Sequence, residues 1–200
     1  SSQAGKYAAV LNDFNKERQD LQKESLDIAD KNIDLKHKII FVADKFNPGI
    51  IGLIAGRLTE KYSLPSIIIA KNGQVAKGSC RSIPEVNIIE VLRKFSDLFV
   101  DLGGHPGAAG FSILDKNIPK LKKKLLNYFS TYLLNYSAQK SITIDAKMDT
   151  SAINLKNIKL IKNLEPFGIG NPEPLFLFEN LTIESKRLLG QNQNHLNHQP

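Results

Sequence analysis

The chain has 200 residues, 42% of them hydrophobic, which is enough for one domain of ordinary size and part of another. Its 27 lysines and arginines against 20 aspartates and glutamates give a net charge of +7, which favours polyanionic partners such as nucleic acid. Cys80, the one cysteine, excludes an intramolecular disulfide framework, and there is no long apolar run or signal-peptide pattern, so we expect a cytoplasmic protein without a membrane span.

The first segment, residues 1–36, is predicted to be a long amphipathic helix. Apolar residues recur mostly every three or four positions over residues 7–30, among charges and without Gly or Pro. Such a helix fits a connector that packs against another domain; the alternative is that it covers the sheet that follows. The chain starts without Met and ends in a polar tail, residues 191–200, so we expect a piece of a longer polypeptide.

Residues 37–138 show an α/β pattern, for which we expect a mixed sheet with flanking helices. The pattern predicts strands at 39–43, 65–70 and 74–79, with a hairpin turn at Asn72-Gly73, and helices at 50–62, 88–99 and 118–136. Gly52 and Gly56, four positions apart, would leave one face of the first helix smooth enough for close packing or a ligand. The four lysines at 120 and 122–124 are expected to form a solvated face.

Residues 139–200 differ in character and are expected to form a partial β domain. The pattern predicts strands at 141–148, 175–178 and 181–189, a short helix at 152–163, a Gly- and Pro-rich loop at 164–174, and a tail without a core pattern at 191–200. Three strands are too few to close a barrel, so we expect this domain to be incomplete.

A glycine-rich stretch at residues 102–111 surrounds the single histidine His105 with four glycines and two alanines. Glycine permits positive φ and lets a ligand approach a row of backbone N–H donors, so an anion site is one interpretation. The other is a tight turn that leads into a strand at 111–114. These residues alone leave the two interpretations open.

Three segments of the α/β region could meet to form an oxyanion site. The candidate residues are Asn47 at a strand-to-helix junction, Ser79, Arg81 and Ser82 after a strand, and Gly103, Gly104 and His105 in the glycine-rich stretch. Helix N-termini attract anions, and a guanidinium offers a planar fork for a phosphate. Arg81 could equally be a surface cation.

Groups that would carry out chemistry are scattered in this sequence. Its aspartates and histidines form no cluster with metal-ligand spacing, so we expect no metal site and no catalytic residue here. Cys80 beside Arg81 could have a lowered pKa, but a small buried thiol is the favoured interpretation. The residues alone therefore predict a binding module.

The sequence resembles the DHH-associated domain of the DHH phosphoesterase superfamily. The matching motifs are residues 48–58 (PGIIGLIAGRL), 78–84 (GSCRSIP) and 103–110 (GGHPGAAG). Residues 12–19 (NDFNKERQ) and 164–174 (LEPFGIGNPEP) narrow the resemblance to the RecJ family of single-strand-specific exonucleases. It extends from the first helix into the last domain, whose start would then be part of an OB-fold.

The resemblance implies a 5′-to-3′ exonuclease of DNA repair and recombination that acts on single-stranded DNA. Mn²⁺ or Mg²⁺ would be held by an N-terminal DHH domain that is absent here, leaving this chain inactive alone. Arg81, Ser79 and residues 103–105 would hold DNA phosphates opposite the metals, and the OB-fold would grip the strand. A helicase or a single-strand-binding protein is a candidate partner.

The sequence departs from the family pattern at two positions. Asn47 stands where relatives often carry His, and Cys80 stands where Gly is common, so we expect narrower access to the backbone there. Two rival functions are a non-catalytic nucleic-acid-binding module and a fragment of an oligonucleotide or cyclic-dinucleotide phosphodiesterase.

Overall fold

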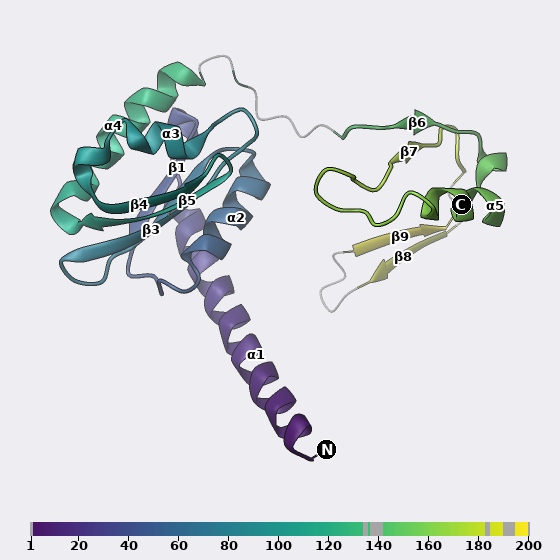
Figure 1. Ribbon diagram of the computed structural model, residues 1–200, viewed down its shortest axis with the longest axis horizontal. Helices are drawn as coiled ribbons and strands as arrows, with labels where there is room; N and C mark the ends of the chain where they lie inside the picture. The colour runs from purple at the N-terminus through teal and green to yellow at the C-terminus, as the bar shows by residue number, and fades with distance from the viewer. Residues whose placement is uncertain (1, 134–135, 137–141, 183–184, 190–194, 200) are drawn as a thin grey trace. The chain divides into compact units, whose positions relative to one another are not determined.

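A five-stranded mixed sheet of order β1-β2-β3-β5-β4 lies at the centre of the first of two units in the computed structural model (Figure 1). Its strands are β1 (Ile40–Asp44), β2 (Ser66–Ala70), β3 (Val75–Arg81), β4 (Phe99–His105) and β5 (Ala108–Leu114). β1 and β2 are parallel and all other pairs are antiparallel, which confirms the expected mixed sheet. The units are Ser1–Lys140 and Ser141–Pro200, and the structure describes residues 2–133, 136, 142–182, 185–189 and 195–199.

Four helices surround this sheet, and they divide its two faces unequally. They are α1 (Ser2–Lys31), α2 (Ile51–Tyr62), α3 (Ile88–Arg93) and α4 (Ile118–Tyr132), with short 3₁₀ turns at Leu35–His37, Ser96–Leu98 and Asp115–Asn117. α3 and α4 cover one face with a core that reaches all five strands. On the other face, α2 and the end of α1 pack on β1 and β2. No helix in the described residues is long and apolar enough to cross a membrane.

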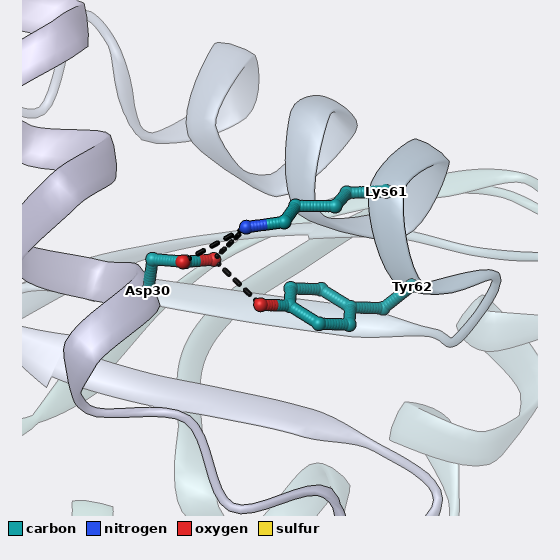
Figure 2. Close-up of polar contacts among 3 residues, drawn as sticks. All are labelled: Asp30, Lys61 and Tyr62. Carbon is teal, nitrogen blue, oxygen red and sulfur yellow. Dashed lines mark hydrogen bonds and ion pairs between the residues drawn. The ribbon is translucent and has the colours of Figure 1, made fainter.

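α1 contains the helical pattern at 7–30 but ends at Lys31, before the predicted limit at residue 36. Its C-terminal end is fixed to α2 by polar contacts (Figure 2). Lys61 Nζ donates to both carboxylate oxygens of Asp30 at 3.0 and 2.9 Å, and the Tyr62 hydroxyl donates to the same carboxylate at 2.8 Å. The hydrogen bond from Lys61 and, to a smaller extent, the one from Tyr62 hold the pKa of Asp30 below its ordinary value. The N-terminal part of α1, residues 3–20, is exposed along its length.

The predicted helix at 88–99 ends earlier than expected, at Arg93. Phe99 is instead the first residue of β4, and its ring lies 4.8 Å from that of Phe111 on β5. The gain from this aromatic pair on the core face explains why the chain leaves the helix before Phe99. The predicted helix at 118–136 corresponds to α4, which ends earlier, at Tyr132; residues 134–135 lie outside the described residues.

The glycine-rich stretch is a β-hairpin, β4 and β5, with its turn at Pro106-Gly107. β4 was not predicted from the sequence, because glycine has low strand propensity. Glycine is nevertheless needed on the core face of the sheet. Gly78 of β3 pairs directly with Phe111, and a Cβ at Gly78 would clash with the phenyl ring at Cζ.

The second unit contains short elements. They are β6 (Ala146–Lys147), a 3₁₀ turn (Thr150–Ala152), α5 (Leu155–Lys162), β7 (Phe176–Leu177), β8 (Ser185–Leu189) and β9 (His195–Gln199). β6 pairs with β7 in parallel, and β8 pairs with β9 in antiparallel fashion. The strand predicted at 141–148 was too long, since only two of its described residues, 146 and 147, join a ladder. Residue 141 and residues 183–184 of the predicted strand 181–189 lie outside the described residues.

The tail at 191–200 has no core pattern in its sequence, yet residues 195–199 form β9. Its backbone groups bond to those of β8, a pairing that needs no apolar pattern in the sequence. Residues 190–194 and 200 lie outside the described residues. The loop at 164–174 is as predicted; it contains a cis peptide bond before Pro166, and the Asn171 amide donates to the carbonyls of Leu164 and Pro166.

The contact between Gly78 and Phe111 predicts the effect of adding one methyl group. Gly78→Ala should destabilise the protein by about 1–3 kcal/mol in urea denaturation, because the core must shift to admit the Cβ. The matched control is Gly56→Ala on α2, where a Cβ meets no described atom within 4 Å. This control should gain about 0.5–1 kcal/mol from helix propensity. Equal stability of the two variants would contradict the packing described.

The contacts of Asp30 predict a pH-dependent contribution to stability. Because the folded pKa of Asp30 is lowered, its stabilising effect is complete at neutral pH and is lost as the pH falls below about 4. The difference in urea midpoint between wild type and Asp30→Asn should therefore be larger at pH 7 than at pH 3. Asp27→Asn, an exposed position on the same helix, is the control and should show no such change. A difference for Asp30→Asn that is independent of pH would show that the carboxylate charge is not what matters.

Candidate functional site

The open face of the sheet, formed by β3, β5 and β4 beside α2, brings together residues from distant parts of the sequence. Directly paired residues in antiparallel strands point to the same face, so three rows of side chains cross these strands. The rows are Arg81, Ala108 and His105; Ser79, Gly110 and Gly103; and Lys77, Ser112 and Asp101. The sheet places Ser79, Arg81, Gly103 and His105, four of the predicted site residues, on one surface.

The middle of the open face is made of small residues. Ala108 and Gly110 lie on the central strand β5, with Gly103 beside Gly110 on β4. In the described part of the chain, no atom lies within 4 Å of where a Cβ on Gly103 would be. With strands about 4.8 Å apart, the backbones of Arg81 and His105 are separated by about 10 Å. The result is a flat floor with a basic residue at one side and a histidine at the other.

Arg81 is the principal cation at this floor. It is half-buried, its Nη1 donates to the Cys80 carbonyl at 3.1 Å, and its Nη2 lies 3.8 Å from the position of a Cβ on Gly52 of α2. The same Cβ would lie 3.2 Å from Ser79 Oγ, so glycine at position 52 leaves room for both side chains. Among the described residues no carboxylate pairs with Arg81. Its positive charge is therefore available to an anion.

His105 lies at the exposed end of β4, where the hairpin turns. Its Nδ1 accepts a hydrogen bond from the Gly107 amide at 3.3 Å. In the neutral ring this leaves the proton on Nε2, which can donate to a ligand. Gly104, the neighbouring candidate, faces the opposite side and has φ +151°, and a Cβ there would collide with the Ala108 carbonyl. Gly104 thus shapes the hairpin that presents His105.

Like Gly104, the predicted site residues Asn47 and Ser82 lie outside the three rows. Asn47 Oδ1 accepts from the Gly49 amide at 2.8 Å, which closes the turn before α2. The Ser82 hydroxyl donates to the Val86 carbonyl at 2.7 Å, and its amide donates to the Gly107 carbonyl at 2.9 Å. Both side chains hold the local backbone. Ser82 thereby ties the end of β3 to the turn beside His105.

The open face includes a cation that sequence reasoning missed, Lys77. Its Nζ donates to Ser112 Oγ at 2.9 Å across the β3–β5 pair. Lys77, Ser79 and Arg81 alternate along β3, and this period of two was the signal that could have identified Lys77. Asp101 lies in the same row and adds a negative charge at this end of the face.

A groove of about 780 Å³ continues from Arg81 between α1 and α2. Its lining includes the basic residues Arg18, Lys23 and Arg57 as well as Gly52 and Gly56. Because no described atom would contact a Cβ at Gly56, the glycine there widens the groove without a packing reason. The smooth face of α2 that the sequence predicted therefore lies next to Ser79 and Arg81 at Gly52, and lines the open groove at Gly56.

Cys80 belongs to the core on the opposite face of β3 and is fully buried. Burial raises the pKa of its thiol well above the ordinary value, which favours the neutral thiol over the thiolate. The expectation that Cys80 narrows access to the backbone was wrong, because alternation along the strand turns it away from the open face. Among the described residues, no group of three His, Cys, Asp or Glu side chains could hold a metal ion.

Comparisons with known proteins identify the class of this fold and surface. A family model described as the DHHA1 domain matches residues 35–131, and one described as the RecJ OB domain matches residues 144–199. The first unit thus contains a DHHA1 domain, as the three motifs at 48–58, 78–84 and 103–110 together predicted. The hairpin, Arg81 and His105 all lie within it.

Individual relatives narrow this class. The chain is 31% identical over 202 residues to the single-stranded-DNA-specific exonuclease RecJ of Bacillus subtilis, covering 98% of this chain and 26% of the relative. It is 29% identical to RecJ of Haemophilus influenzae, covering 81% of the chain and 29% of the relative. The structure of Thermus thermophilus RecJ in complex with Mn²⁺ matches with a TM-score of 0.78 and 28% identity, over 96% of this chain and 28% of that one.

The chain belongs to the RecJ family. This confirms the resemblance seen in the sequence and the mixed α/β fold class. The chain spans about a quarter of the length of the curated relatives it matches. A further structure of the Thermus protein contains Mg²⁺ in place of Mn²⁺, so both metals are found with this relative.

Proposed function

We propose that this chain is the substrate-binding part of a metal-dependent exonuclease that degrades single-stranded DNA from 5′ to 3′ in cytoplasmic DNA repair and recombination. The open face would bind the phosphates of the strand. Half-buried Arg81, with no carboxylate partner among the described residues and beside a floor of glycine and alanine, is the observation that carries the proposal. The RecJ OB match at 144–199 and the net charge of +7 support a single-stranded substrate longer than the short oligonucleotides of the rival phosphodiesterase function.

Each side chain of the open face has a distinct task in this proposal. The Arg81 guanidinium binds one phosphate through two N–H donors, and the Ser79 hydroxyl can add a third. Nε2–H of His105 donates to a phosphate oxygen from the other side of the floor. Gly103 and Gly110 let the sugar–phosphate chain lie close to the sheet. These residues position the scissile bond.

The bond-breaking chemistry is assigned to Mn²⁺ or Mg²⁺ in an N-terminal DHH domain of the same polypeptide, where metal ions can activate water and stabilise charge on phosphate. The described part of this chain offers no ligand set for such ions. In this proposal residues 1–36 are the connector, residues 37–138 the phosphate-binding domain and residues 139–200 the OB-like domain. A helicase and a single-strand-binding protein are the candidate protein partners.

Replacing Arg81 tests the phosphate contact directly. Arg81→Ala should weaken binding of oligo(dT) by about tenfold, because a charge-assisted hydrogen-bond pair is lost. It should also reduce the slope of log K against log salt by about 0.7, since one phosphate contact no longer releases a counterion. Fluorescence anisotropy at several salt concentrations measures both quantities.

The matched control is Lys71→Ala, which removes the same charge from an exposed side chain paired with Asp115 at 3.5 Å. Its affinity and salt slope should stay close to those of wild type. Equal effects of the two substitutions would mean that only net charge matters, and Arg81 would then be an ordinary surface cation.

The division of labour between domains predicts that the purified chain is catalytically silent. With Mn²⁺ and 5′-phosphorylated single-stranded DNA it should bind the oligonucleotide but release no nucleotide, as measured by denaturing gel electrophoresis. Binding in the same sample shows that the chain is folded. Sustained release of mononucleotides would reveal a metal site within this chain and overturn the assignment.

A further inference from the structure

A partly exposed aromatic cluster lies across the sheet from Arg81, on α4 and the segment after α3, with Tyr132 as its exposed ring and Phe95 and Tyr128 half-buried. It borders a hollow of about 520 Å³ lined by Phe95, Lys124, Asn127, Tyr128, Thr131 and Tyr132. The open face lies on the α2 side of the sheet, whereas α3 and α4 pack on the other side. The cluster therefore takes no part in the phosphate site described above.

The rings of this cluster are held in a fixed arrangement. Tyr128 and Tyr132, one helical turn apart, are stacked with centroids 5.3 Å apart and planes 18° apart. Phe129, which is fully buried, meets Tyr128 and Tyr132 edge-on at 5.4 and 6.4 Å. The Tyr132 hydroxyl donates to the Glu85 carbonyl at 3.4 Å. Tyr132, the outermost ring, is 51% exposed and preorganised for a further planar group.

Positive charges flank these rings. Lys94 Nζ lies 5.7 Å from the centroid of Tyr128, and Lys124 Nζ lies 5.2 Å from that of Phe95. α4 contains four lysines and no acidic residue. Lysine is depleted in the centre of protein–protein interfaces, so rings between ammonium groups fit a protein partner poorly. Alternating rings and cations are typical of surfaces that bind single strands through bases and phosphates.

We propose that Tyr128 and Tyr132 form a base-stacking platform for single-stranded nucleic acid, with Lys94 and Lys124 contacting the adjoining phosphates. The ligand class rests on the proposed function, but the location is separate from the open face. A base stacks on the exposed side of Tyr132 and continues the aromatic stack of α4. This adds a second contact for the strand on a surface where the sequence alone indicated only solvated lysines.

The absence of Trp from the chain makes the platform directly measurable. In Tyr132→Trp the indole is the single reporter, and stacking with a base should quench its fluorescence on addition of oligo(dT). An abasic oligonucleotide of the same length carries the same phosphates without bases, so it should quench little. Phe14→Trp, an exposed position on the N-terminal part of α1, is the control and should show no base-dependent quenching.

A binding measurement completes the test. Tyr132→Leu keeps an apolar side chain but removes the ring, and it should weaken oligo(dT) binding about fivefold or more while leaving abasic binding unchanged. Quenching of Tyr132→Trp should persist in the Arg81→Ala background once the oligonucleotide concentration is raised. Failure of the Arg81 test alone then contradicts the proposed function and leaves the platform supported.

Two results would overturn the platform. Equal quenching by abasic DNA and oligo(dT) would show that the cluster attracts phosphates without stacking bases. No quenching by either oligonucleotide would exclude the strand as occupant and leave the rings as a surface for a protein partner.

Discussion

The two faces of the five-stranded sheet are covered unequally, and the candidate site follows from this difference. α3 and α4 build a core that reaches all five strands, whereas α2 and the end of α1 pack on β1 and β2. Side chains alternate along a strand, so β3, β5 and β4 each present apolar residues to the full core and small or polar residues to the open face. Arg81 lies at the edge of the open face, where α2 begins to cover the sheet.

The glycines of this region serve two different physical needs. Gly78 and Gly104 face the covered side, where the Phe111 ring and the Ala108 carbonyl occupy the space that a Cβ would need. Gly103 and Gly110 face the open side, where a Cβ would meet no described atom closer than 3.9 Å. Packing therefore requires the first pair, while the second pair keeps the backbone accessible. A stability measurement alone reports on the first pair only.

Much of the fold could be predicted from the sequence, because long periodic segments and a strong turn signal are local properties. The helix at α1 and the hairpin turn at Asn72-Gly73 are examples, with Gly73 at φ +86°. β4 and β9 could not be predicted, since their stability depends on partner strands rather than on their own composition. Hydrogen bonds between the backbones of two strands require no hydrophobic pattern in the sequence of either strand.

The same reasoning applies to the site. Arg81 and His105 were identified from residue type and glycine content, but only the register of β3 with β5 and of β5 with β4 places them in one row. Asn47 and Ser82 have suitable chemistry, yet their side chains bond to nearby backbone. Cys80, adjacent to Arg81 in sequence, points to the other face. Adjacent residues of a strand thus lie on opposite faces of the sheet, and their spacing in the sequence alone does not show which face is the open one.

The central claim is that the strand binds on the open face, and backbone amide chemical shifts test it most directly. In a ¹⁵N-labelled sample titrated with 5′-phosphorylated oligo(dT), the account predicts shifts for the amides of Ser79, Arg81, Gly103, His105 and Gly110. Amides of β1, the edge strand farthest from β4, which α2 and the end of α1 cover, should move less. Shifts confined to residues 142–199, with the amides of β3, β4 and β5 unchanged at saturation, would contradict the account.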